Sequence, residues 1–309
     1  MHGDCVIVIR AGRDIINGVA FSPDGRLLAT ACADGWLKVW DAARVGSGDP
    51  LWADQYHRFS ASHVQFSPDG KWLFVSGSDG AAVWKVATGP PGVALPNARN
   101  SRRSASVIVS SRDGKFVAWA GGYRGTTNRI AVARIRPRRF HKSFHGHDDE
   151  IGILVASPGG LISGSADRKI RFWDWATGIL YHEMALRGFV RTLAVTPAGE
   201  WLAGSCAKVI LLWPVQQPAG VRHALPGKPR ELLGHTRTVS CVEFSTDGAT
   251  LVSAGDDGTL RWWDVATGAE RRVLDPGLGA LHWLSFAPDG LTLAFTSDKG
   301  HLGVLDLDG

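Results

Sequence analysis

A short turn signature that returns seven times constrains this chain more than any other feature. Its closing glycines, at positions 25, 70, 114, 160, 199, 248 and 290, follow one another at intervals of 39 to 49 residues. The seven copies are Phe21–Gly25, Phe66–Gly70, Ser111–Gly114, Ser157–Gly160, Thr196–Gly199, Phe244–Gly248 and Phe286–Gly290. Self-similarity at this period indicates an array of repeated supersecondary units that bury their apolar faces against one another.

Each copy of the signature has the composition of a tight turn between two β-strands. Proline presets φ, aspartate bonds to the local backbone, and glycine accepts the positive φ that closes a hairpin. Around the first copy, apolar residues such as Ile16 and Val19 precede the turn, the apolar segment 27–30 follows it, and a second turn comes at Asp34. Helical periodicity is absent throughout, so the sequence predicts an all-β fold class.

A Trp-Asp pair and a Gly-His pair accompany the turn signature. Trp-Asp pairs or weaker versions of them occur at Trp40-Asp41, Trp84-Lys85, Trp173-Asp174, Trp213-Pro214, Trp263-Asp264 and Leu305-Asp306, whereas the third repeat has Ala133-Arg134. Gly-His pairs stand at Gly146-His147 and Gly234-His235. With these motifs the chain resembles the WD-repeat β-propeller family over essentially its whole length. The resemblance implies a single domain, residues 1–309, folded as a seven-bladed β-propeller with four antiparallel strands per blade.

The two ends of the sequence predict how the ring closes. The last repeat stops after the segment 301–307, which corresponds to the third strand of a blade. The apolar segment 5–9 precedes the first repeat and has no hairpin partner there. We therefore expect residues 1–10 to complete the last blade with its fourth strand, as the family resemblance implies, which removes open sheet edges.

Two repeats carry the residues of the family's buried hydrogen-bonded set. The members are His147, Ser163, Asp167 and Trp173 in the fourth blade and His235, Ser253, Asp257 and Trp263 in the sixth. A His-Asp-Ser grouping is also typical of hydrolases, in which a base oriented by a carboxylate activates a hydroxyl. Because the grouping repeats with the blade period, whereas a catalytic triad need occur once, we interpret both sets as structural.

Other motifs with chemical potential are incomplete. His145 and His147 begin a metal-ligand pattern, but Glu150 stands where a third imidazole would follow. His182 begins a zinc-protease pattern, but Leu186 stands where the second histidine would be. No nucleophile elbow, phosphate-binding loop or dinucleotide fingerprint occurs. We therefore predict that the protein is not an enzyme and has no metal or other cofactor.

The resemblance also implies a working surface. Propellers of this family commonly bind partners on one rim, where the connections between blades meet the turns between second and third strands. The candidate partner-binding residues on this rim are Trp36, Tyr123, Arg124, Phe189, Arg191 and His282. Exposed aromatic residues and arginines are enriched at interface hot spots, so we predict a scaffold that binds a protein or peptide. The alternatives are a structural role, such as Trp36 covering the end of a strand, or no role.

Basic segments offer a second hypothesis. The chain has a net charge of +5 and a pI near 9.2, and two connections that we place on the opposite face are basic. The charges are Arg134, Arg136, Arg138, Arg139 and Lys142 in one and Arg222, Lys228 and Arg230 in the other. They could bind nucleic acid or another polyanion. Alternatively, the first group belongs to an outer strand whose edge is protected by charge.

The remaining expectations concern location and assembly. The longest apolar runs are too short to span a bilayer, the N-terminus lacks a signal-peptide pattern, and the four cysteines form no Cys-x-x-Cys pair. We expect a cytoplasmic protein with no membrane contact. We also expect the propeller to be monomeric and to work within a larger complex.

Overall fold

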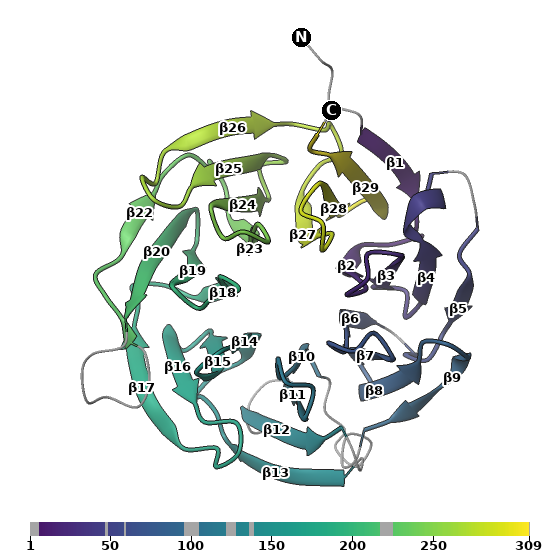
Figure 1. Ribbon diagram of the computed structural model, residues 1–309, viewed down its shortest axis with the longest axis horizontal. Helices are drawn as coiled ribbons and strands as arrows, with labels where there is room; N and C mark the ends of the chain where they lie inside the picture. The colour runs from purple at the N-terminus through teal and green to yellow at the C-terminus, as the bar shows by residue number, and fades with distance from the viewer. Residues whose placement is uncertain are drawn as a thin grey trace.

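The protein is a closed ring of seven β-sheets around a central axis, as the sequence predicts (Figure 1). The computed structural model describes residues 6–46, 49–58, 60–95, 105–121, 128–135, 139–216 and 225–308. Within these residues each sheet is an antiparallel blade whose first strand lies nearest the axis, and one short 3-10 helix, η1 (Ala42–Arg44), is present. The fold class is therefore confirmed as an all-β, seven-bladed propeller.

The strands follow the blade order. Blade 1 consists of β2 (Ile16–Phe21), β3 (Leu27–Cys32), β4 (Leu37–Asp41) and β5 (Trp52–Asp54). Blade 2 consists of β6 (Ala61–Phe66), β7 (Trp72–Gly77), β8 (Gly80–Lys85) and β9 (Gly89–Ala94), and blade 3 of β10 (Val107–Ser110), β11 (Phe116–Ala120), β12 (Arg129–Arg134) and β13 (Arg139–His145). Blade 4 consists of β14 (Ile151–Ser157), β15 (Gly160–Ser165), β16 (Lys169–Trp173) and β17 (Leu180–Ala185).

The remaining blades vary this plan at their outer strand. Blade 5 consists of β18 (Val190–Val195), β19 (Trp201–Cys206), β20 (Val209–Gln216) and an outer strand in two pieces, β21 (Leu225–Pro226) and β22 (Arg230–Leu232). Blade 6 consists of β23 (Val239–Phe244), β24 (Thr250–Gly255), β25 (Leu260–Asp264) and β26 (Glu270–Leu274). Blade 7 consists of β27 (Leu281–Phe286), β28 (Thr292–Ser297), β29 (His301–Asp306) and β1 (Val6–Arg10).

The recurring turn signature closes the hairpin between the first two strands of each blade. In blade 2, the Ser67 hydroxyl donates to Asp69 at 2.6 Å and accepts the N–H of Trp72 at 3.0 Å. Asp69 also accepts the N–H of Lys71 at 3.2 Å. Gly70 has a φ of +67°, which a residue with a Cβ rarely adopts. These bonds explain why serine, aspartate and glycine recur together at this turn.

The predicted ring closure is confirmed for the described residues. β1 pairs antiparallel with β29, from Val6 opposite Leu305 to Arg10 opposite His301. Cys5, the predicted first residue of this strand, lies outside the described residues. Figure 1 shows β1 as the outermost strand of the blade that carries the C-terminal end of the chain. The ends of the chain thus share one sheet, and the seventh blade has four strands.

The hydrophobic core is a set of layers between neighbouring blades. Each innermost strand contacts the innermost strands of both neighbouring blades, so the ring is continuous around the axis. The third-strand tryptophans fill the spaces between sheets, and Trp84 and Trp263 are among the largest fully buried side chains. Six of the seven innermost strands, all except β10, shift register near their first residues. Such bulges change the direction of side chains at the end where the blades are joined.

Candidate functional site

The hydrogen bonds expected in blade 6 are present. His235 Nδ1 lies 3.0 Å from both carboxylate oxygens of Asp257, and His235 Nε2 lies 2.7 Å from the Ser253 hydroxyl. Trp263 Nε1–H donates to the same hydroxyl at 2.9 Å. Because a carboxylate only accepts, Nδ1 carries the proton, and Ser253 donates its own proton to Nε2. The set joins the rim turn, the central strands and the connection from the preceding blade.

Blade 4 repeats this geometry. His147 Nδ1 lies 2.9 and 3.0 Å from the Asp167 oxygens, and its Nε2 lies 2.7 Å from the Ser163 hydroxyl. Trp173 Nε1–H donates to that hydroxyl at 2.8 Å. Ser163 and its counterpart Ser253 are fully buried. A hydroxyl that is fully buried between an imidazole and an indole leaves no place for a substrate carbonyl, so the geometry supports a structural role for both sets.

Burial sets the protonation of these groups. Burial lowers the pKa of His235 and of His147, so both rings are neutral near pH 7. Burial alone would raise the pKa of Asp257, but hydrogen bonds from the Thr236 N–H, the Thr259 hydroxyl and His235 lower it to about 2. Asp257 is therefore an ionised acceptor, and its loss would leave buried donors without a partner.

Blade 5 keeps the tryptophan of this set but not its partners. The strand register pairs Leu202 with Trp213 in blade 5, as it pairs Leu251 with Trp263 in blade 6. Counting two residues on from Leu202 gives Gly204 at the serine position. Counting six residues on gives the aspartate position, which is occupied by a lysine.

Basic residues therefore occupy two positions of the set in blade 5. Lys208 stands at the aspartate position of the turn between β19 and β20. His235 comes three residues after Leu232, which pairs with Ile210. Arg187 comes three residues after Met184, which pairs with Ile170 at the equivalent place in blade 4. Arg187 therefore stands at the histidine position. Both basic side chains are exposed. Sequence reasoning missed this substitution, because the connection before blade 5 lacks the Gly-His pair that marks the position.

The rim residues predicted for partner binding fall at different places on the ring. Phe189 precedes β18 and is 66% exposed, while the next residue, Val190, is buried and anchors the segment to the blade. Arg191 is exposed. Burial lowers the pKa of His282, and Arg191 lowers it further, whereas Asp256 raises it. Phe189 and Arg191 belong to blade 5 and His282 to blade 7, with blade 6 between them.

The other predicted rim residues belong to other parts of the chain. Trp36 is half-buried in the turn of blade 1, where its backbone N–H donates to Asp34 at 3.2 Å. Blade 1 and blade 5 are separated by blades 6 and 7 on one side of the ring, so a partner that contacts Trp36 and Phe189 together must span the channel opening. Tyr123 and Arg124 lie outside the described residues.

A groove next to Phe189 gives the rim a concave surface. It has a volume of about 680 Å³ and lies between blades 4 and 5. Asp148, Asp167, Arg168, Arg187 and Phe189 are among its lining residues. An exposed aromatic ring beside a charged groove is a suitable surface for a protein segment.

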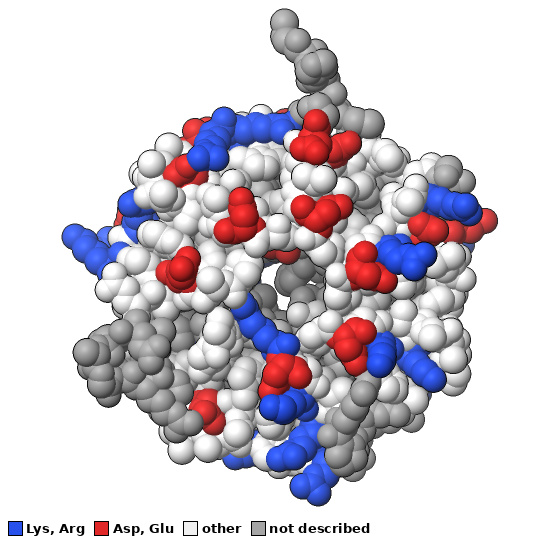
Figure 2. Space-filling view, viewed as in Figure 1, with Lys and Arg blue, Asp and Glu red and all other residues white. Residues whose placement is uncertain are grey.

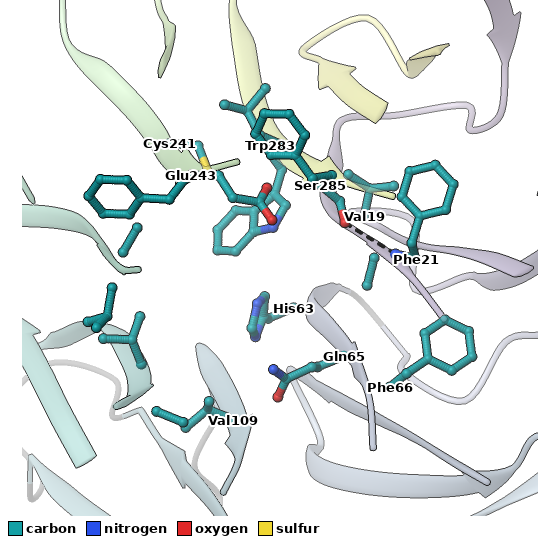
Figure 3. A pocket seen from close by; sticks show the side chains of 18 of the residues that line it. Val19, Phe21, His63, Gln65, Phe66, Val109, Cys241, Glu243, Trp283 and Ser285 are labelled. Atoms are coloured by element: carbon teal, nitrogen blue, oxygen red, sulfur yellow. Dashed lines mark hydrogen bonds between the residues drawn. The ribbon is translucent and has the colours of Figure 1, made fainter. Parts of the chain in front are cut away.

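The innermost strands also enclose a central channel with a volume of about 560 Å³ (Figure 3). Its wall is mostly apolar, but Figure 3 shows the side chains of His63, Gln65, Glu243, Trp283 and Ser285 directed into it. Sequence reasoning did not identify these residues. A usable signal exists: Gln65, Glu243 and Ser285 are polar residues that stand directly before the phenylalanine at the start of the turn signature.

Most polar residues of the channel wall connect neighbouring blades. Gln65 Oε1 accepts the N–H of Ser110 at 2.8 Å, and His63 Nδ1 accepts the N–H of Ile108 at 3.3 Å. Ser285 Oγ accepts the N–H of Phe21 at 3.2 Å, across the junction of blades 7 and 1. Burial lowers the pKa of His63 to about 4, so the ring stays neutral. These groups satisfy backbone donors that the blade geometry leaves unpaired.

Glu243 is the exception in the channel wall. Burial raises its pKa to about 8, although its carboxyl accepts a hydrogen bond from the Phe286 backbone. Its Oε2 atom has no hydrogen-bond partner among the described residues. Glu243 is therefore largely protonated near neutral pH, and it weakens rather than strengthens the inner wall when it ionises.

One end of the channel is spanned by an arginine. Arg112, in the first turn of blade 3, donates from Nε to the carbonyl of Ala156 at 3.2 Å and from Nη2 to that of Thr196 at 3.1 Å. Its Nη1 donates to the carbonyl of Pro197. Arg112 therefore joins blade 3 to blades 4 and 5 at the mouth opposite the rim.

No cluster of three or more His, Cys, Asp or Glu side chains suitable for holding a metal ion occurs in the parts of the chain that the structure describes. In the same residues, no helix has the length and hydropathy needed to cross a bilayer.

Comparison with known families agrees with this architecture. The family model described as WD domain, G-beta repeat matches residues 3–41, 50–83, 138–174 and 227–264. Each matched segment begins at the outer strand of one blade and continues through the first three strands of the next. Together with the seven blades, these matches show that the chain contains WD repeats and folds as a seven-bladed β-propeller.

Curated relatives are distant and much longer than this chain. Protein groucho of Drosophila melanogaster is 26% identical over 246 residues, which cover 76% of this chain and 31% of groucho. Telomerase protein component 1 is 25% identical in Mus musculus over 394 residues and 25% in Rattus norvegicus over 399 residues. Both alignments cover 98% of this chain and 15% of the relative. The chain thus spans less than a third of the length of these relatives.

Proposed function

We propose that the chain is a non-catalytic interaction module that binds a protein segment or peptide on the rim at Phe189 and Arg191. The observation that carries this proposal is the 66% exposure of Phe189 on a segment fixed by the buried Val190. An aromatic side chain held rigidly in water contributes strongly to binding, because little conformational freedom is lost when a partner covers it. His282 and Arg191 extend the same surface toward the axis.

Other findings support an interaction role over catalysis. The two His-Ser-Asp groups, which resemble hydrolase machinery, are buried and hydrogen-bonded within their blades. The WD repeats support a scaffold, since the WD repeat defines a fold rather than a reaction. The name of one relative, telomerase protein component 1, describes a component of an assembly. We propose that this chain likewise works within a complex.

Binding of nucleic acid or another polyanion on the opposite face is the second candidate, but the basic side chains that the structure describes there are partly occupied. Arg230 donates to the carbonyl of Ala266 at 2.9 Å, and Lys142 Nζ donates to that of Thr177 at 2.6 Å. Arg136, Arg138 and Arg222 lie outside the described residues. Figure 2 shows blue and red side chains mixed around the face turned to the viewer. A mixed surface holds a polyanion less strongly than a continuous basic one.

The test is to purify a partner captured by the immobilised chain and to measure its affinity for point variants. We expect Phe189→Ala to weaken binding by about 2 kcal/mol or more, as for a well-packed aromatic anchor, and Arg191→Ala to weaken it as well. The matched control is Leu233→Ala, since Leu233 is also 66% exposed but lies in the next connection between blades. All three variants should keep the melting temperature of the wild type.

A charge-reversed variant of Arg134, Arg139 and Lys142 tests the second candidate at two salt concentrations. Rim binding predicts an unchanged affinity for this variant and a weak salt dependence. Loss of binding only in the charge-reversed variant, with a steep salt dependence, would replace the rim with the opposite face.

A further inference from the structure

The turn between the second and third strands in blade 5 differs from the turn in five other blades. In blades 1, 2, 4, 6 and 7 the turn carries at least one aspartate, namely Asp34, Asp79, Asp167, Asp256 and Asp298, which in blades 4 and 7 is followed directly by a basic residue. The corresponding turn of blade 3 lies outside the described residues. In blade 5 the turn is Ala207-Lys208, without an acid. The connection that enters blade 5 adds Arg187, and β18 adds Arg191. The rim therefore has a basic sector centred on blade 5.

The cations of this sector are not neutralised by the fold. The side chains of Arg168, Arg187, Arg191 and Lys208 are exposed, and none of them forms a hydrogen bond or ion pair with another residue of the described ranges. Arg171, one strand away, shows the contrast, because its Nε donates to Glu183 at 2.6 Å. Ion-paired arginines stabilise the scaffold, whereas unpaired ones at a rim remain available to a ligand.

The acids that line the adjoining groove, Asp148, Asp149 and Asp167, keep their negative charge, but within the described residues none of them is ion-paired with Arg168 or Arg187. Asp167 accepts from His147 and from the backbone N–H groups of Asp148 and Lys169 at 2.9 to 3.1 Å. The Asp148 carboxylate lies 3.4 Å from Arg171. Arg168 and Arg187 line the same groove beside Phe189 without such partners. The groove thus presents free guanidinium groups next to an exposed aromatic ring.

We propose that the basic sector, defined as Arg168, Arg187, Phe189, Arg191 and Lys208, binds an acidic peptide segment that places a large apolar side chain on Phe189. This inference rests on the proposed function and specifies the chemistry of its partner. Guanidinium groups bind carboxylates through paired, charge-assisted hydrogen bonds, and Phe189 supplies the apolar contact.

The neighbouring blades favour a peptide over a nucleic acid. Asp148, Asp149 and Glu150 follow one another at the entry to blade 4, and Asp256 and Asp257 form the turn of blade 6. The basic sector is therefore bounded by acids on both sides. A nucleic acid carries charge along its whole length and would extend over these acids, whereas a peptide can confine its carboxylates to the sector.

The experiment is selection of a displayed random 12-residue peptide library on the immobilised wild-type chain, followed by affinity measurement of the enriched peptides. We expect enrichment of Asp and Glu around one large apolar residue. Replacing the carboxylates of an enriched peptide by amides should weaken it at least tenfold. The double variant Arg187→Glu/Arg191→Glu should weaken it by a similar factor, and the affinity should fall as salt is raised.

The control for the charge change is Arg13→Glu, because Arg13 is an exposed arginine on the rim of blade 1, next to Asp14. This variant should bind the peptides as the wild type does. Enriched peptides that are neutral or basic, a failure to enrich any peptide, or equal losses in both charge variants would overturn the inference. Tighter binding of a labelled 20-nucleotide single strand at the same arginines would favour a nucleic acid instead.

The same variants distinguish an error in this inference from an error in the proposed function. If peptides or a captured partner lose affinity with Phe189→Ser but not with Arg187→Glu/Arg191→Glu, the rim is the binding surface and its ligand is not acidic. If Phe189→Ser has no effect on any ligand, the proposed function itself is wrong.

Discussion

Blades 5 and 6 are neighbours built on one strand plan, yet they use three equivalent positions in different ways. In blade 6, His235, Ser253 and Asp257 are tied to one another and to a buried tryptophan. In blade 5 the histidine and aspartate positions carry Arg187 and Lys208, whose side chains extend into solvent. Blade 6 holds its rim connection with internal hydrogen bonds. Blade 5 leaves two charged groups free at the equivalent positions.

Blade 5 keeps its shape without the hydrogen bonds, because apolar packing replaces them. A Cβ at Gly204 would lie 2.7 Å from the Leu193 side chain and 3.4 Å from the Trp213 ring. These side chains therefore fill the space that the serine hydroxyl occupies in blade 6. One position of the repeat can thus be structural in one blade and available for recognition in the next, provided that the tryptophan stays buried.

The largest effect should be common to both blades. Removing residues 1–10 deletes β1 and leaves β29 as an open edge, so we expect a loss on the order of 5 kcal/mol or aggregation on expression. Chemical denaturation of the truncated and full chains measures it. Hydrogen exchange should show that blades 5 and 6 lose protection together, and unchanged stability would contradict ring closure by this strand.

The second effect should differ between blade 6 and blade 5. Asp257→Ala should destabilise the protein by about 1 to 3 kcal/mol, because it leaves the N–H groups of His235 and Thr236 buried or poorly paired. Lys208→Ala, at the same position in blade 5, should change the free energy of unfolding by less than about 0.5 kcal/mol. If urea denaturation shows the same loss of free energy of unfolding for both variants, stability depends on the turn residue in general and not on the hydrogen bonds of Asp257.

A pH dependence distinguishes the inner strands. Blade 6 has Glu243 in the channel wall, whereas blade 5 has Ala194 at the equivalent position, since Ala194 pairs with Ala203 as Glu243 pairs with Val252. Because the pKa of Glu243 in the folded protein is about 8, above its ordinary value, the folded state binds the proton more tightly than the unfolded chain does. Stability from this group is present below the ordinary pKa and is lost as the pH rises through about 8.

The corresponding variant is Glu243→Gln, which cannot ionise. We expect it to match the wild type near pH 5 and to exceed it by about 4 kcal/mol near pH 9. Thermal melting across this pH range measures the difference. A constant difference at all pH values would show that Glu243 does not titrate in the folded state.

The smallest effect concerns the turn of blade 5. Ala207, one residue before Lys208, has a φ of +53°, whereas in the turns of blades 1, 6 and 7 the positive φ falls on a glycine later in the turn, namely Gly35, Gly258 and Gly300. Ala207→Gly should therefore stabilise the protein by about 0.5 kcal/mol. Gly258→Ala in blade 6 should have the opposite sign. Precise calorimetry of both variants tests whether the backbone of blade 5 is strained where its charges are presented.

The repeat made most of this fold predictable. The turn signature depends on local chemistry, so the blade count, the hairpins and the closing strand could all be inferred from sequence. The buried sets of His147 and His235 were predictable because the family motif fixes their spacing. Their absence from blade 5 was visible, but the identity of Arg187 as the replacement was not, since the connections differ in length.

The channel wall was harder to predict. Which side chains face the axis depends on the register shift near the start of six inner strands, and no composition signal marks that shift. The partners of Gln65 and His63 belong to the next blade, about one repeat further along the chain. The clustering of Phe189 with unpaired arginines likewise depends on which turn is adjacent in space.

Arg112 connects blade 3 to blade 5, which is not its direct neighbour in the ring. Seven blades that contact only their neighbours can shear, and the circle can flatten toward an ellipse while every contact between neighbours is kept. A guanidinium fixed to carbonyls of both blade 4 and blade 5 prevents that distortion on one side of the ring. The same group lines the channel, so a solute that enters from this mouth passes a fixed positive charge before it reaches the apolar wall.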